Sequence, residues 1–194
     1  KWPDLRARFG AVKVHMIGPL QTNKAKLALD LFDAIHTVDR ASLAEKLARL
    51  VQDRGACPEL FVQVNTGAEA QKAGVLPTEV DGFIAMCRGL DLPLRGVMCI
   101  PPEGEDAGPH FTALAGIAAR NGLDGLSMGM SSDFEAAIAA GVRRIEAQAG
   151  LNLEHLHVGR GLGLVVDRDP LARAAPGDED LHAEVAERGV AGRR

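Results

Sequence analysis

Short apolar segments alternate with helical segments along most of the chain, and this alternation constrains the fold more than any other feature. Apolar runs that end at glycine, proline or a polar turn predict strands, whereas leucines and alanines at helical spacing predict helices. The predicted strands span residues 11–18, 34–39, 60–66 and 94–100, with a short fifth strand ending near residues 127–129. The predicted helices span residues 22–32, 42–53, 77–88, 107–121 and 134–140. Five such alternations are typical of the α/β class with a parallel sheet.

The composition argues against several functional classes. The 194 residues are 46% hydrophobic and 25% charged, which is enough apolar material for the core of one globular domain. A net charge of −4 argues against a general nucleic-acid surface, and no apolar run approaches the roughly 18 residues of a membrane helix. The three cysteines lack metal-binding or redox spacing, and no signal peptide is recognised. We therefore expect a cytoplasmic chain with no metal site and with neither nucleic acid nor membrane as a partner.

The segment of residues 126–141 combines a strand end, a polar turn and a helix start. Ser131, Ser132 and Asp133 precede the helical run, where their oxygens can accept the unpaired backbone N–H groups of the first turn. Gly141 follows the run, where a left-handed C-cap is expected. A helix N-terminus behind a small polar loop is suited to binding a phosphate. An ordinary βα turn has the same pattern, so both interpretations stay open.

Two further polar segments follow predicted strands. Residues 15–26 place His15 on a strand and then gather Gln, Thr, Asn and Lys side chains beyond Gly18. A single histidine on a strand is most often a buried residue whose hydrogen bonds are satisfied. Residues 64–74 are polar and contain two glycines, which fits either a long surface loop or a binding loop. Both segments are expected at the carboxyl ends of the strands.

Four sequence motifs occur in a fixed order along the chain, and together they are far more specific than any one of them alone. They are His15-Met-Ile-Gly-Pro-Leu-Gln-Thr-Asn-Lys24, Gln63-Val-Asn-Thr66 with Lys72 and Gly74, Arg95-Gly-Val-Met-Cys-Ile-Pro-Pro102, and Leu126-Ser-Met-Gly-Met-Ser-Ser-Asp133. In this order they resemble the pyridoxal phosphate homeostasis protein family, which shares a barrel with the N-terminal domain of alanine racemase. The resemblance covers roughly residues 11–142. It implies a (β/α)8 TIM-type barrel that binds pyridoxal 5′-phosphate, the vitamin B6 cofactor, at the carboxyl ends of its strands.

The resemblance also implies cofactor-binding residues. Ser127 matches the serine whose hydroxyl and neighbouring amides take the phosphate, and Gly129 lets the backbone approach it. Arg144 is the candidate for the pyridine nitrogen. The family's Gly-Thr phosphate cradle is replaced by Glu146 and Ala147, and a carboxylate beside a phosphate opposes binding. The resemblance therefore implies an impaired site without catalytic residues.

The chain departs from the family at both ends. Family members hold the cofactor aldehyde on a lysine of the first strand, in a Val-Ser-Lys-Thr-like segment that does not occur here. The sequence starts just before what resembles the third strand, so we expect a truncated, incomplete barrel without the first two βα units. Residues 1–150 are expected to form this partial barrel. Residues 151–194, glycine-rich and then charged, are expected to form a divergent tail without a nucleotide-binding glycine pattern.

The resemblance implies a non-catalytic carrier or buffer of pyridoxal 5′-phosphate, and two alternatives stay open. One is a cofactor-dependent amino-acid racemase. Racemisation needs a Schiff-base lysine and an opposing base such as tyrosine, and this chain has no tyrosine. The other is a fragment that cannot bind the cofactor. Open edges of an incomplete barrel further predict self-association of the chain.

Overall fold

A computed structural model describes residues 13–130 and 133–140 of the chain. In this part, five parallel strands form one sheet in the order β1-β2-β3-β4-β5, so neighbours in the sheet are neighbours in sequence. The strands are β1 (His15–Met16), β2 (Ala34–Val38), β3 (Glu59–Gln63), β4 (Leu94–Met98) and β5 (Gly125–Ser127). The predicted α/β class with a parallel sheet is confirmed.

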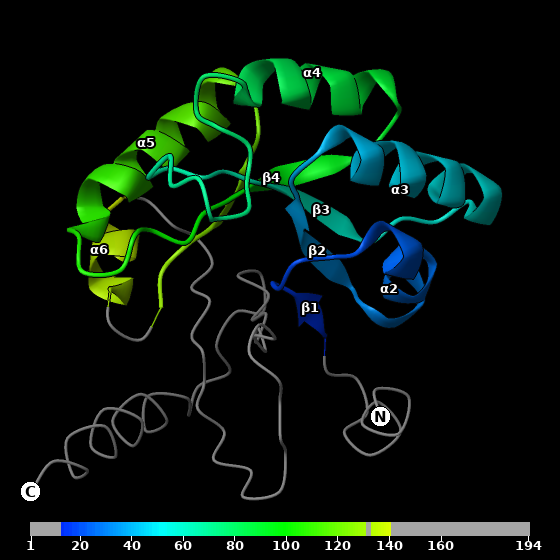
Figure 1. Ribbon diagram of the computed structural model, residues 1–194, viewed down its shortest axis with the longest axis horizontal. Coiled ribbons are helices and arrows are strands. Elements are labelled where there is room, and N and C mark those ends of the chain that lie inside the picture. Colours follow the sequence, from blue (N-terminus) through cyan, green and yellow to red (C-terminus); the bar gives the residue numbers. More distant parts are fainter. Residues whose placement is uncertain (1–12, 131–132, 141–194) are drawn as a thin grey trace, which may run out of the picture.

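Each described strand is followed in the chain by a helix. The helices are α2 (Ala25–Leu31) after a short 3-10 turn η1 (Thr22–Lys24), α3 (Ala41–Arg54), α4 (Val80–Gly89), α5 (Ala107–Arg120) and α6 (Phe134–Ala139). Figure 1 shows the helices arranged in an arc around one side of the sheet. Sequential parallel strands with helices outside are successive units of a (β/α)8 barrel. The described residues thus form an incomplete barrel of five strands, as predicted. The expected boundary between residues 1–150 and 151–194 lies outside the described residues.

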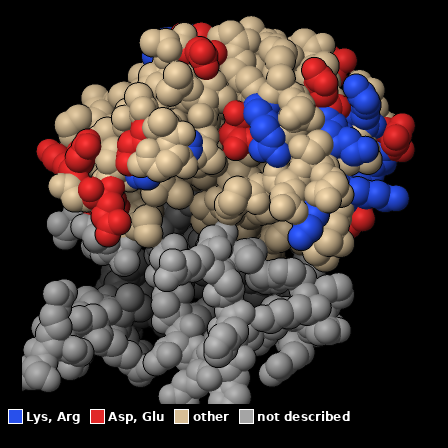
Figure 2. All heavy atoms as spheres, viewed as in Figure 1, with Lys and Arg blue, Asp and Glu red and all other residues tan. Residues whose placement is uncertain are grey.

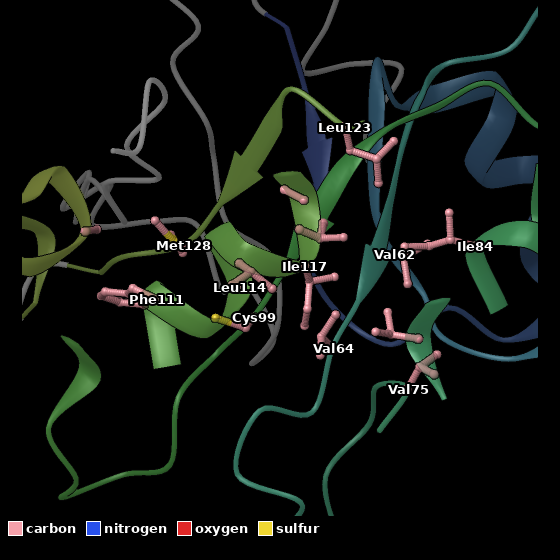
Figure 3. Close-up of a cluster of buried hydrophobic side chains, with 14 of the residues drawn as sticks. Val62, Val64, Val75, Ile84, Cys99, Phe111, Leu114, Ile117, Leu123 and Met128 are labelled. Atoms are coloured by element: carbon pink, nitrogen blue, oxygen red, sulfur yellow. The ribbon is translucent and has the colours of Figure 1, made fainter. Parts of the chain in front are cut away.

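The hydrophobic core lies between the sheet and the helices. In one buried cluster, Val62 of β3 lies beside Ile84 of α4, and Phe111 lies beside Leu114 on α5 (Figure 3). In a second cluster, Leu43 and Leu47 lie one turn apart on α3 and are buried with residues of β2 and β3. Leu60 and Val62, alternate residues of β3, therefore face outward to the helices, and the residues between them face the interior of the barrel.

Charged side chains lie on the outer surface of the helices. On the face shown in Figure 2, Lys and Arg side chains gather on the side of α2 and α3, with Asp and Glu side chains among them. Arg120 of α5 lies 2.9 Å from Asp81 of α4, and the hydrogen bonds from Arg120 and Asn121 lower the pKa of the Asp81 carboxyl. Within the described residues, every helix is too short or too polar to cross a membrane.

Two glycines allow β4 and β5 to pair closely. Gly96 and Gly125 are partners in the register of these strands. A Cβ atom on Gly96 would lie 2.1 Å from the carbonyl oxygen of Gly125, and one on Gly125 would lie 2.8 Å from Cε1 of Phe61. Neither distance is compatible with van der Waals contact, so any side chain at these positions would push neighbouring groups away.

We predict that Gly96→Ala lowers the free energy of unfolding by about 1–3 kcal/mol, because the added methyl group overlaps the backbone of β5. Gly116→Ala is the matched control. Gly116 lies in the middle of α5, and beyond the neighbouring backbone of its own helix no atom lies within 4 Å of the place that a Cβ atom would take, so alanine there should stabilise the chain by roughly 0.5–1 kcal/mol. Urea unfolding of both variants measures the difference. Equal stability of the two variants would contradict the close pairing of β4 and β5.

Candidate functional site

Three polar side chains form a hydrogen-bonded row inside the barrel. Nδ1 of His15 lies 3.0 Å from Nε2 of His36, and Nδ1 of His36 lies 2.8 Å from Oγ of Ser127. The residues are only 1–2% exposed to solvent. Burial of a polar group costs free energy unless the group is hydrogen-bonded, so the hydrogen bonds within this row allow its three side chains to be buried.

The row shows how strongly the sheet curves. His15, His36 and Ser127 belong to β1, β2 and β5, and two strands separate β2 from β5. On a flat sheet, three strand spacings of about 4.8 Å would place β2 and β5 roughly 14 Å apart. The 2.8 Å contact between His36 and Ser127 is possible because the sheet bends around its interior. The inward-facing ends of distant strands are thereby brought to one place.

An aromatic ring supports the row from one side. The rings of His36 and Phe61 are stacked, with their centroids 4.2 Å apart and their planes 7° from parallel. Phe61 in turn lies against Gly125 of β5, where a side chain would collide with it. The imidazole of His36 is therefore fixed at both nitrogens and on one face.

Two buried hydroxyl groups lie at the ends of neighbouring strands. Thr37 is the residue before Val38, the last residue of β2, and Thr66 follows β3. In the described structure, the buried Oγ1 atoms of Thr37 and Thr66 have no hydrogen-bond partner. Such hydroxyl groups are suited to a polar ligand or to water.

The turn after β5 has the predicted glycine but a different role for the aspartate. Gly129 has φ +94°, a left-handed conformation that favours glycine. Helix α6 begins at Phe134, as predicted. The expectation that the Asp133 side chain caps this helix is wrong, because its carboxylate accepts a hydrogen bond from the backbone N–H of Met130 in the preceding turn. The carboxylate therefore braces the turn behind Ser127 instead of occupying the first-turn amides.

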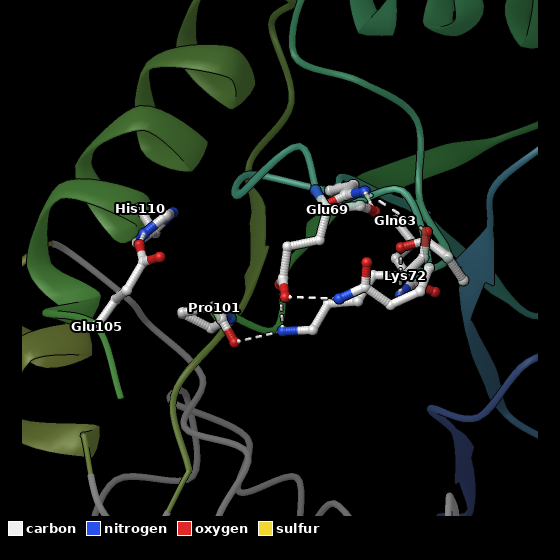
Figure 4. Close-up of polar contacts among 9 residues, drawn as sticks. Gln63, Glu69, Lys72, Pro101, Glu105 and His110 are labelled. Atoms are coloured by element: carbon white, nitrogen blue, oxygen red, sulfur yellow. Dashed lines mark hydrogen bonds and ion pairs between the residues drawn. The ribbon is translucent and has the colours of Figure 1, made fainter. Parts of the chain in front are cut away.

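The segment of residues 64–74 is a loop held by its own side chains. Asn65 accepts a hydrogen bond from the backbone N–H of Glu69 and donates one to the carbonyl oxygen of Glu69. Lys72 lies 2.6 Å from the Glu69 carboxylate and donates to the carbonyl oxygen of Pro101 in the loop after β4 (Figure 4). The loop after β3 is thus tied to the loop after β4, and the charge of Lys72 is used in this contact.

The structure brings together some of the predicted residues and adds others. Ser127 lies at the end of β5, and His15 is the satisfied buried histidine that the sequence suggests. Arg144, Ser131 and Ser132 lie outside the described residues. The polar side chains of residues 21–24 lie in and directly before η1, where Thr22 Oγ1 accepts a hydrogen bond from Arg40.

Sequence reasoning missed two residues of the interior. His36 lies in β2 and Phe61 in β3, both of which are largely apolar. The histidine within an otherwise apolar strand is the signal in the sequence that could have indicated His36. A cavity of about 430 Å³ lies elsewhere, outside the barrel between Arg40 and α4, and includes none of the interior polar residues. Among the described residues, no three His, Cys, Asp or Glu side chains are grouped to hold a metal ion.

Comparison with known families agrees with this geometry. The pattern of the family described as alanine racemase, N-terminal domain, matches residues 3–156. The chain belongs to this family. The match extends further at both ends than the segment of residues 11–142 that carries the four motifs.

Several relatives carry the name pyridoxal phosphate homeostasis protein. The relative from Vibrio cholerae is 38% identical over 140 residues, which cover 68% of this chain and 59% of that protein. The relative from Escherichia coli is 42% identical over 138 residues, covering 66% of this chain and 58% of that protein. The chain thus spans about three fifths of the length of these relatives. The predicted resemblance to their family is confirmed.

Solved structures support the same fold. PipY of Synechococcus elongatus without pyridoxal phosphate has a TM-score of 0.69 and 33% identity, and the match covers 75% of this chain and 74% of PipY. The same protein with pyridoxal phosphate bound has a TM-score of 0.64 and 31% identity, covering 74% and 72%. The barrel predicted for the chain is therefore the fold of this family.

We predict that Asp133→Ala accelerates amide hydrogen exchange of Met130 by about tenfold, because the backbone N–H loses a hydrogen bond to a charged acceptor that contributes roughly 1.5 kcal/mol. Asp133→Asn is the control, since its side-chain oxygen can still accept this hydrogen bond. Faster exchange in α6, with Met130 unchanged, would show instead that Asp133 caps the helix.

Proposed function

We propose that the chain binds pyridoxal 5′-phosphate at the carboxyl ends of its strands, as a non-catalytic carrier or buffer of the cofactor. The observation that carries this proposal is the position of Ser127. Its buried hydroxyl lies at the end of β5, as the last member of the interior row, and shortly before the left-handed turn at Gly129. A hydroxyl donor next to a glycine turn is a common way to hold a phosphate group.

The donor groups present fit the phosphate end of the cofactor. Ser127 supplies a hydroxyl, and Gly129 leaves the backbone without a Cβ atom at the turn. The Oγ1 atom of Thr66, which lacks a partner in the described structure, supplies a further polar group beyond the end of β3. The family, the names of the relatives and the cofactor bound to PipY support this assignment.

The residues of the chain would hold and orient the cofactor. Pyridoxal phosphate supplies an aldehyde and an electron-withdrawing pyridine ring when it is bound. Ser127 would hold the phosphate, and Arg144, which lies outside the described residues, is the candidate for the pyridine nitrogen. Glu146, also outside the described residues, would weaken phosphate binding through charge repulsion. We therefore expect weak binding that depends on Ser127.

A racemase is the second candidate function, because the family is named after alanine racemase. Racemisation needs two bases on opposite faces of the substrate, and the 194 residues include no tyrosine to act as one of them. A fragment without affinity for the cofactor is the remaining alternative. A carrier changes the absorbance spectrum of added cofactor without converting L-alanine to D-alanine, and a racemase does both. A fragment that cannot bind the cofactor neither changes the spectrum nor converts L-alanine.

The proposal includes a cytoplasmic location and self-association through the edges of the sheet. In the described residues, β1 pairs with β2 alone, which leaves its other side available to residues beyond this part or to a second chain. Sedimentation of the chain tests this: a concentration-dependent increase in mass is expected, and a compact monomer at all concentrations would contradict it.

We predict that Ser127→Ala weakens binding of pyridoxal 5′-phosphate by about ten- to a hundredfold, because a hydrogen bond to a charged phosphate contributes roughly 1.5–3 kcal/mol. Ser42→Ala is the control, since Ser42 is an exposed serine in the first turn of α3. Calorimetric titration with pyridoxal phosphate and with inorganic phosphate measures both. Unchanged affinity of Ser127→Ala would place the phosphate elsewhere.

We also predict that borohydride reduction in the presence of the cofactor labels lysines without strong preference. Lys24, Lys26 and Lys46 are exposed, and Lys72 is engaged with Glu69 and Pro101. None occupies the family's lysine position on the first strand. Peptide mapping should therefore show scattered labelling. A single dominant site, for example at Lys24, would contradict this and would indicate a specific covalent attachment.

A further inference from the structure

We propose that His36 is a positioning residue that directs the hydroxyl hydrogen of Ser127 toward a bound phosphate. The inference rests on the proposed function. In it, His15 donates a hydrogen bond to His36 and His36 donates one to Ser127, and both hydrogen bonds have this direction in the ligand-free chain. His36 acts through Ser127 and does not itself contact the ligand.

The surroundings of His36 leave its ring one orientation. Its Nε2 is 3.0 Å from Nδ1 of His15, and its Nδ1 is 2.8 Å from Oγ of Ser127. Phe61 is stacked on one face of the ring at 4.2 Å between centroids. A rotation of the imidazole about its long axis would lose both hydrogen bonds, and water would not easily replace them, because His15, His36 and Ser127 are only 1–2% exposed.

The chemistry of a phosphate ligand fixes the direction of the row. An ionised phosphate oxygen accepts hydrogen bonds, so a serine that binds it must donate its single hydroxyl hydrogen to it. Ser127 must then accept from His36, which requires the hydrogen of neutral His36 to be on Nδ1. Nε2 of His36 is in that case an acceptor, and Nδ1 of His15 must carry the hydrogen that it accepts.

The opposite direction gives a site that disfavours phosphate. If His36 carried its hydrogen on Nε2, it would donate to His15, and Ser127 would donate its hydroxyl hydrogen to His36 Nδ1. The oxygen of Ser127 would then present only lone pairs to the ligand. The tautomer of one buried histidine therefore decides whether the hydroxyl group of Ser127 attracts or repels an anion.

Two variants of His36 separate the two hydrogen bonds. The amide of asparagine reaches the position of Nδ1, so His36→Asn can still donate to Ser127 while losing the contact with His15. The longer glutamine reaches the position of Nε2, so His36→Gln keeps a partner for His15 and loses the donor to Ser127. Each variant keeps one of the two hydrogen bonds and loses the imidazole ring that stacks on Phe61. The loss of packing against Phe61 is therefore common to both variants, and a difference between them reports on the hydrogen bonds.

Affinity for pyridoxal 5′-phosphate, measured by calorimetry on the full chain, is expected to fall by about tenfold in His36→Gln and by less than about threefold in His36→Asn. Pyridoxal, which lacks the phosphate, should show no difference between the two variants. In the Ser127→Ala background, His36→Gln should change the affinity by less than about twofold, because the residue through which His36 acts is gone. Equal losses in both variants, or full additivity with Ser127→Ala, would overturn the proposal.

The tautomer is measured independently of the cofactor. Nitrogen-15 NMR of the ligand-free chain at alkaline pH, labelled at histidine, should show the hydrogen of His36 on Nδ1. The His36 signals are assigned as those that shift in Ser127→Ala, which removes the partner of Nδ1. A hydrogen on Nε2 would overturn the inference even if the cofactor binds. Failure of the parent chain to bind pyridoxal phosphate, with the Nδ1 tautomer present, would overturn the proposed function and leave the row intact.

Discussion

The hydrogen bond between His36 and Ser127 is the interaction on which the interior of this structure depends. It joins β2 to β5 across a sheet in which two strands lie between them. A buried hydrogen-bonding group that loses a partner costs about 1–3 kcal/mol, so a flatter sheet, which would separate His36 from Ser127, is disfavoured. The outward faces of the same strands pack against the helices, which favours the same curvature. Polar pairing inside and apolar packing outside therefore support one geometry.

That geometry also requires small residues where the strands are most crowded. Phe61 reaches from β3 to β5 because Gly125 has no side chain in its way, and Gly96 lets β4 pair closely with β5. The space so created holds the stacked rings of Phe61 and His36. The aromatic pair orients the polar row, and the row ends at Ser127, where we place the phosphate. Packing of the interior and binding of the cofactor are thus linked through one histidine.

Most elements of the fold could be predicted because strand and helix periodicities are local. The helix predicted at residues 42–53 is found at Ala41–Arg54, and the strand predicted at residues 34–39 is found at Ala34–Val38. The strand predicted at residues 11–18 is described only at His15–Met16. The role of Asp133 was misjudged, since the same carboxylate can accept from the helix or from the preceding turn and only the backbone path selects between them.

The sequence by itself determined the class of fold, the family and the candidates Ser127 and Gly129, because motif order and hydrophobic periodicity are written in consecutive residues. Only the tertiary structure decided that His15, His36 and Ser127 meet, since they come from three strands and 112 positions separate the first from the last. The curvature of the sheet sets such contacts. It arises from the summed packing of all five strands and helices, which no short stretch of sequence encodes.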